Sequence, residues 1–67
     1  MKERGKEMYE EAKRIVIEHQ WASTPLLQRK LRIGYAKAVR LLVMLEENGV
    51  IGGFNGAKPR KVLIFNH

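Results

Sequence analysis

Five positively charged side chains occur between Leu26 and Leu45, and no acidic residue lies among them. They are Arg29, Lys30, Arg32, Lys37 and Arg40. An arginine guanidinium donates paired hydrogen bonds to phosphate or another two-oxygen acceptor, and a lysine ammonium is a compact charge that suits phosphate. Scattered exposed cations usually form only a solvated surface. A cluster of one sign in so short a stretch instead predicts a polyanionic ligand.

The positive charge is concentrated in the middle and the last third of the chain. The 67 residues carry a net charge of +6, yet residues 1–20 hold five basic and five acidic side chains. Residues 46–67 add Lys58, Arg60 and Lys61 against two glutamates. For a domain of this size, such a one-signed region favours nucleic acid as the ligand.

Residue types suited to catalysis or metal binding are sparse. There is no cysteine, and the two histidines, His19 and His67, lie far apart. The basic stretch holds no nucleophile–base or carboxylate pair, so we expect no enzyme activity, no cofactor and no metal site. The segment GGFNGAKP lacks the G-x-x-x-x-G-K-[S/T] spacing of a phosphate-binding loop. Without a signal peptide or a membrane-length apolar run, we expect a soluble, cytoplasmic protein.

Residues 3–19 carry the pattern of an amphipathic helix. Apolar side chains recur every three or four residues from Met8 to Val16, and charged side chains fill the opposite face. Tyr9 and His19 lie at the edge of this stripe, where we interpret them as packing residues.

Two further helices are predicted, over residues 25–32 and 35–48. Thr24 and Pro25 form a helix start, because the threonine hydroxyl can cap a free N–H and proline fits the first turn. Between the helices, we expect Gly34 to hold a backbone conformation that other residues resist. Two helices joined by a tight turn with a glycine are typical of a helix-turn-helix.

The last third of the chain is predicted to form a β-hairpin over residues 50–65. Two apolar runs, 50–51 and 62–65, flank a segment of glycine, asparagine and proline that carries the basic residues of the tip. Three helices followed by such a hairpin describe a winged helix-turn-helix, which is an α+β fold with mainly α structure. We expect residues 1–67 to form one DNA-binding domain, in which Lys58, Arg60 and Lys61 of the wing contact the DNA backbone or the minor groove.

The third predicted helix has one face for the core and one for a ligand. Its core positions are Ala38, Leu42 and Leu45, with Tyr35 and Leu41 at the borders.

The opposite face of this helix carries Ala36, Arg40, Val43 and Glu47, flanked by Lys37 and Met44. In a helix-turn-helix this helix enters the major groove, where Arg40 would meet a base edge and Lys37 a phosphate. Ala36 and Val43 would touch a thymine methyl or allow close approach. Two other interpretations stay open: Val43 packs under the wing, or Val43 and Met44 dock a protein partner.

The segments STPLLQRKLRIGYAKAVRLL, LEENGVIG and GAKPRKVL resemble the γ domain of the FtsK/SpoIIIE DNA translocases, from about Tyr9 to Ile64. The resemblance implies a winged helix that reads short, G-rich, asymmetric sites in double-stranded DNA and orients a motor for chromosome segregation in cell division. It also implies a nucleoid-associated domain of a membrane-anchored parent translocase, with a XerD-type tyrosine recombinase as a possible partner. Whether the chain is an excised domain or a freestanding relative stays open.

Three positions depart from the pattern of that family. Its reading helix commonly begins Gly-Tyr-Asn-Arg or Gly-Tyr-Thr-Arg, and an acidic residue often follows the next arginine by one turn. Arg40 matches that arginine, whereas Ala36, Lys37 and Val43 replace the asparagine or threonine, the first arginine and the acid. The resemblance therefore carries over the arginine contact but not the polar contact at Ala36 or the acidic one at Val43.

Two alternatives to a sequence-directed DNA-binding module remain. A winged helix that docks a recombinase or another protein would carry its charge incidentally, and its affinity would not fall steeply with salt as a DNA complex does. A small transcriptional regulator usually dimerises to read palindromes. No spare apolar helix for a dimer is evident in the sequence, which argues against the regulator.

Overall fold

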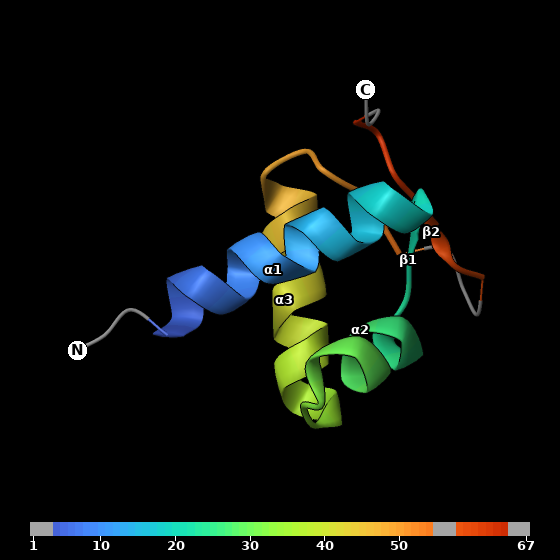
Figure 1. Ribbon diagram of the computed structural model, residues 1–67. Coiled ribbons are helices and arrows are strands. Elements are labelled where there is room, and N and C mark those ends of the chain that lie inside the picture. The colour runs from blue at the N-terminus through green and yellow to red at the C-terminus, as the bar shows by residue number, and fades with distance from the viewer. Residues whose placement is uncertain (1–3, 55–57, 65–67) are drawn as a thin grey trace.

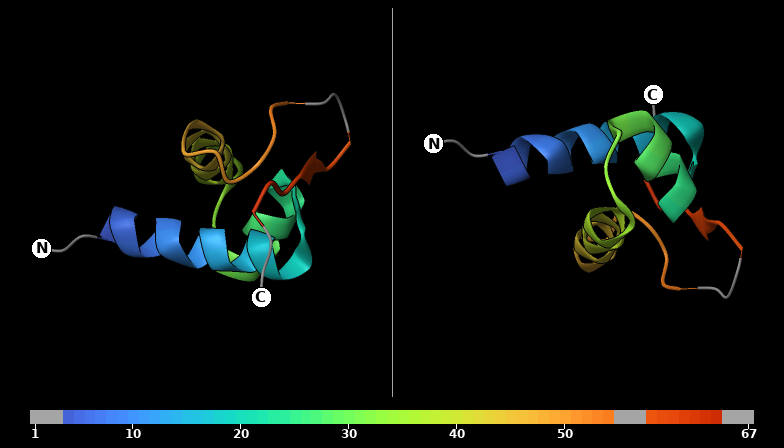
Figure 2. Two further views of the ribbon diagram at one scale, coloured as in Figure 1. Left: turned by 90° about the horizontal axis from the view of Figure 1, so that it is seen from above. Right: turned by 90° about the horizontal axis from the view of Figure 1, so that it is seen from below.

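The computed structural model describes residues 4–54 and 58–64 and contains three helices and a small antiparallel sheet (Figure 1). In chain order the elements are α1 (Arg4–His19), β1 (Trp21–Ala22), α2 (Thr24–Leu31), α3 (Tyr35–Glu47) and β2 (Arg60–Lys61). Viewed from below, α3 is seen end on, with α1 and α2 to one side of it (Figure 2). The predicted winged-helix class and its three helices are confirmed.

The apolar stripe of α1 forms one wall of the core, as predicted. Ala12 and Val16 are fully buried, and Met8, Tyr9 and Ile15 pack against the core from the side. Helix α1 contacts both α2 and α3, so one stripe serves two neighbours. His19, at the edge of this stripe, is exposed and packs its ring against Trp21 in an edge-to-face arrangement, with a centroid distance of 6.2 Å.

Helix α2 begins one residue earlier than predicted, and its cap is Ser23 rather than Thr24. Ser23 has an extended backbone, with φ −155° and ψ 160°, and its Oγ accepts a hydrogen bond from the Leu26 N–H at 3.2 Å. Thr24 already belongs to the helix, so Pro25 still lies in the first turn, where its missing N–H leaves no hydrogen bond unmade.

The turn between α2 and α3 does not depend on Gly34, so that prediction is wrong. The left-handed residue is Arg32, with φ 57° and ψ 49°, and the Ile33 N–H donates to the Gln28 carbonyl at 3.2 Å. Gly34 is extended, with φ −78° and ψ 174°, and a Cβ built there would meet nothing within 4 Å. The reversal is completed before the glycine, which only precedes the first turn of α3.

Gly49, directly after α3, occupies a position that favours glycine, because its φ is +75°. Its N–H donates to the Glu46 carbonyl at 3.0 Å, and the Val50 N–H donates to the Leu45 carbonyl at 2.9 Å. This pair of hydrogen bonds is the Schellman arrangement that ends a helix at a left-handed residue.

The wing, described over residues 50–54 and 58–64, contains the predicted antiparallel hairpin and also pairs with a strand that was not predicted. Strand β2 pairs antiparallel with β1, with Trp21 opposite Lys61 and Ala22 opposite Arg60. On its other side this segment meets residues 50–52, through an Ile51–Val62 bridge.

Two backbone hydrogen bonds hold that second side of β2. The Gly52 N–H donates to the Lys61 carbonyl, and the Leu63 N–H donates to the Val50 carbonyl, each at 2.8 Å. The final strand therefore lies between β1 and residues 50–52. The predicted run 62–65 begins too late, since Leu63 and Ile64 are exposed, and Phe65 lies outside the described residues.

Replacing Gly34 or Gly49 by serine should change the free energy of unfolding in opposite directions. Gly34→Ser should raise the free energy of unfolding by about 0.5–1 kcal/mol, because serine can cap α3 and restricts the unfolded chain. Gly49→Ser should lower it by about 1 kcal/mol, because a side chain at positive φ is strained. Urea unfolding of both variants measures these changes, and a larger loss at Gly34 than at Gly49 would contradict this account of the turn.

Candidate nucleic-acid interface

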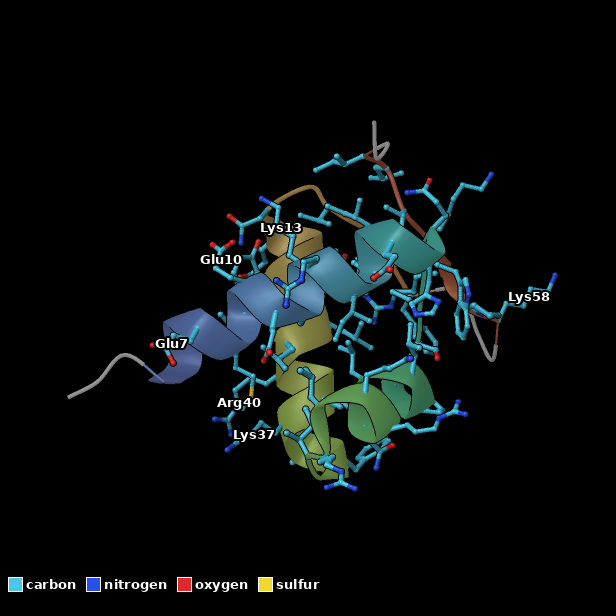
Figure 3. The ribbon with its side chains drawn as sticks, in the orientation of Figure 1. Glu7, Glu10, Lys13, Lys37, Arg40 and Lys58 are labelled. Atoms are coloured by element: carbon cyan, nitrogen blue, oxygen red, sulfur yellow. The ribbon has the colours of Figure 1, made fainter. Side chains whose placement is uncertain are left out.

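One face of α3 is buried and the other is open to solvent. Ala38, Leu41, Leu42 and Leu45 are buried, which confirms the predicted core face. The predicted ligand face is exposed at Ala36, Lys37, Arg40, Val43 and Glu47. Lys37 and Arg40 project from the same side of the N-terminal half of α3 (Figure 3). Among the described residues, neither forms an ion pair, so both charges are available to a ligand.

Three more cations surround the turn that leads into α3. Arg29 and Lys30 lie in the last turn of α2, Arg32 follows directly, and all three are exposed. The first two also oppose the negative C-terminal end of the α2 dipole, which is a sufficient structural reason for basic residues there. The fold brings these cations to the end of the molecule where α3 begins, as the helix-turn-helix interpretation requires.

The wing contributes two exposed cations and one that is already engaged. Lys58 and Lys61 are exposed. The side chain of Arg60 is only 13% exposed, and its Nη1 donates to Glu46 Oε1 at 2.9 Å. The Arg60 guanidinium also lies 5.9 Å from the centre of the Phe54 ring. Arg60 thus ties the wing to α3, so much of its charge is neutralised within the protein.

A groove between α3 and the wing was not anticipated from the sequence. It has a volume of about 210 Å³, and Tyr35 and Val39 line it on the helix side while Phe54 and Lys58 line it on the wing side. Tyr35 was predicted at the border of the core, but it is 68% exposed. Phe54 is 77% exposed. The sequence did not predict this groove, because the wing is positioned by its pairing with β1, and a strand of two residues leaves no recognisable pattern.

The acidic side chains lie mainly on the exposed face of α1. Glu7, Glu10, Glu11 and Glu18 are exposed, and Glu11 pairs loosely with Arg14 at 3.9 Å. Figure 3 shows Glu7 and Glu10 on α1, whereas Lys37 and Arg40 extend from α3. In the described part of the chain, no group of three or more histidine or acidic side chains is placed to hold a metal ion. Nor does any described helix have the length and apolar character to cross a membrane.

The sequence profile described as the Ftsk gamma domain matches residues 3–65. The chain belongs to this family. It is 52% identical over 58 residues to the DNA translocase FtsK of Bacillus cereus, an alignment that covers 87% of this chain and 7% of that protein. It is 55% identical over 58 residues to the DNA translocase FtsK of Clostridium tetani, covering 87% of this chain and 8% of the relative.

The DNA translocase SpoIIIE of Bacillus subtilis is 48% identical over 58 residues, covering 87% of this chain and 7% of its own length. The Ftsk gamma domain described here therefore spans less than a tenth of the length of these relatives. The match confirms the predicted resemblance over nearly the whole chain.

The Glu46–Arg60 pair should couple the wing to α3 in stability measurements. Glu46→Ala and Arg60→Ala, alone and combined, should give a coupling energy of about 0.5–1 kcal/mol, because both side chains are partly screened by solvent. Glu47→Ala is the matched control, because Glu47 is an exposed neighbour on the same helix, and its coupling to Arg60 should be close to zero. Equal coupling for both glutamates would show that the contact is only a general charge effect.

Proposed function

We propose that this Ftsk gamma domain is a double-stranded DNA-binding module that reads a short, G-rich, asymmetric sequence and so orients a DNA translocase during chromosome segregation. The observation that carries the proposal is the position of Arg40. It is exposed on the open face of α3, opposite the buried Ala38 and Leu42, in the helix that follows the helix-turn-helix turn.

Arg40 has the chemistry to read guanine. Its guanidinium can donate two parallel hydrogen bonds to O6 and N7 of guanine in the major groove, which is the commonest specific contact to a base. Ala36 is small and lies one turn before Arg40, so the helix can approach the base edges closely. The Leu41 and Leu42 side chains are buried, so the backbone that carries Arg40 is held by the core.

The other cations supply contacts that do not depend on sequence. Arg29, Lys30 and Arg32 surround the entry to α3, and Lys37 lies beside Arg40. Contacts of this kind to phosphate fix the register of a protein on a duplex, and base contacts then specify the site. Lys58 and Lys61 extend the same role to the wing.

An asymmetric site is what a reading helix without a two-fold related partner would recognise. A two-fold dimer reads a palindrome and cannot distinguish the two directions along DNA, whereas one domain reads a sequence with a direction. The relatives that share about half of the residues are named DNA translocases. We propose that the motor is supplied by such a protein and that this domain supplies the direction.

The alternative of a protein-docking surface has less support. That surface would be formed by Val43, Met44 and the wing. Met44 packs against the core, whereas Val43 and Phe54 of the wing are exposed. Val43 remains exposed between charged neighbours on the helix, which is a small apolar area for a protein interface.

Arg40→Ala should remain folded but lose discrimination for guanine by about 1–3 kcal/mol, because the bidentate contact is removed while the core is untouched. Competition binding at fixed salt, with a G-rich duplex selected from random sequences and a single-base variant of it, measures the change.

Lys37→Ala is the matched control for Arg40→Ala. It removes a neighbouring cation of α3 that we assign to phosphate, so it should weaken both duplexes by the same factor. If Arg40→Ala also weakens both duplexes equally, Arg40 is a phosphate contact and the proposed reading of guanine is wrong.

The wing should contribute to the salt dependence of binding through Lys58 rather than Arg60. Lys58→Ala should reduce the slope of log affinity against log salt by about one unit, because one phosphate contact releases about one counterion. Arg60→Ala should change the slope less, since Glu46 already neutralises that guanidinium. Titrations at several salt concentrations measure both slopes, and an unchanged slope for Lys58→Ala would remove the wing from the interface.

A further inference from the structure

Val43 is an exposed apolar side chain that the packing of the domain does not explain. It lies on the open face of α3, three residues after Arg40, and is 41% exposed. The described residues of the wing approach α3 at Glu46, through Arg60, and in the groove beside Tyr35 and Val39. Within residues 50–54 and 58–64 neither contact includes Val43, so the described part of the wing does not support the interpretation that Val43 packs under it.

The neighbours of Val43 on the helix surface are the side chains assigned to DNA. Residues three or four apart on a helix lie side by side, about 5–6 Å between their Cβ atoms. Arg40 is therefore adjacent to Val43, and Ala36 is adjacent to Arg40. Along this face an arginine that can donate two hydrogen bonds stands between two side chains that can neither donate nor accept one.

We infer that Val43 is a specificity-determining residue that contacts the 5-methyl group of a thymine close to the guanine read by Arg40. This inference rests on the proposed function. In the major groove thymine differs from cytosine by its methyl group and by O4 in place of an amino group. A valine gains from covering the methyl and leaves the N4 amino group of cytosine without an acceptor.

The chemistry of the patch favours a methyl group over a protein partner. The exposed apolar side chain is bordered by Arg40 and Glu47, and Met44 turns to the core. A protein interface needs a contiguous apolar centre, whereas one methyl group is covered by one valine. The phosphate contacts of the neighbouring cations would also hold this helix in the groove, so that Val43 faces the base next to the one read by Arg40.

The test removes only the methyl group. The probe is the duplex selected from random sequences, in which deoxyuridine replaces thymine at one position at a time near the guanine that depends on Arg40. We expect one deoxyuridine to weaken binding by the wild-type protein about threefold to fivefold, the effect of uncovering one methyl group. Val43→Ala should lose most of this difference, because the shorter alanine side chain covers less of the methyl group, and alanine suits an exposed helical position.

A second variant tests the same contact by changing which base the protein prefers. Val43→Glu should move the preference at that base pair from thymine toward cytosine, because a carboxylate accepts from the cytosine N4 amino group. The added negative charge should weaken all duplexes, so the ratio of the two affinities is the quantity to compare. Glu47→Gln, one turn further along the same face, is the control and should leave the ratio unchanged.

The outcomes separate this inference from the proposed function. If no deoxyuridine position weakens wild-type binding while Arg40→Ala still loses guanine discrimination, the thymine contact is wrong and the proposed function stands. If Val43→Ala is weakened as much as the wild type by deoxyuridine, the methyl is covered by another residue and the inference also falls. If binding shows no dependence on salt or on guanine, the proposed function itself fails.

Discussion

The burial of one face of α3 is the constraint on which the rest of the site depends. Ala38, Leu41, Leu42 and Leu45 are buried where α3 meets α1 and α2. Each buried leucine contributes about 1.5–3 kcal/mol relative to an exposed one. A rotation of α3 that turned Arg40 inward would expose these leucines and bury a charge without a partner. The core therefore sets which side chains of this helix can meet a ligand.

The distribution of charge around that core determines which side of the domain attracts a polyanion. Around α1 the glutamates are matched by basic side chains, since residues 1–20 hold five of each, whereas residues 21–67 hold eight basic and two acidic side chains. A polyanion is therefore attracted to the part of the molecule formed by α2, α3 and the wing, and this attraction weakens as salt increases. The Glu46–Arg60 contact adds a positional constraint, because it joins β2 to the last turns of α3 and so holds the wing beside the reading helix.

Much of this arrangement could be predicted from the sequence, for identifiable physical reasons. The three helices follow from apolar side chains at helical spacing, and the open face of α3 follows from the same periodicity. The turn could not be predicted, because Arg32 takes the left-handed conformation that a glycine was expected to take. Strand β1 was missed because two residues show no alternation, and its pairing with β2 joins parts of the chain far apart in sequence. The ion pair between Glu46 and Arg60 could not be predicted either, because it joins two residues far apart in the sequence and no local pattern indicates it.

The proposed function places DNA against the N-terminal half of α3 and the wing, and not against α1. The most direct measurement is an NMR titration of the amide signals of the 67-residue chain with a G-rich duplex. We expect shifts concentrated in residues 34–43 and at Lys58 and Lys61, with the amides around Glu7, Glu10 and Arg14 unchanged. Shifts concentrated on α1, or none on α3, would contradict it.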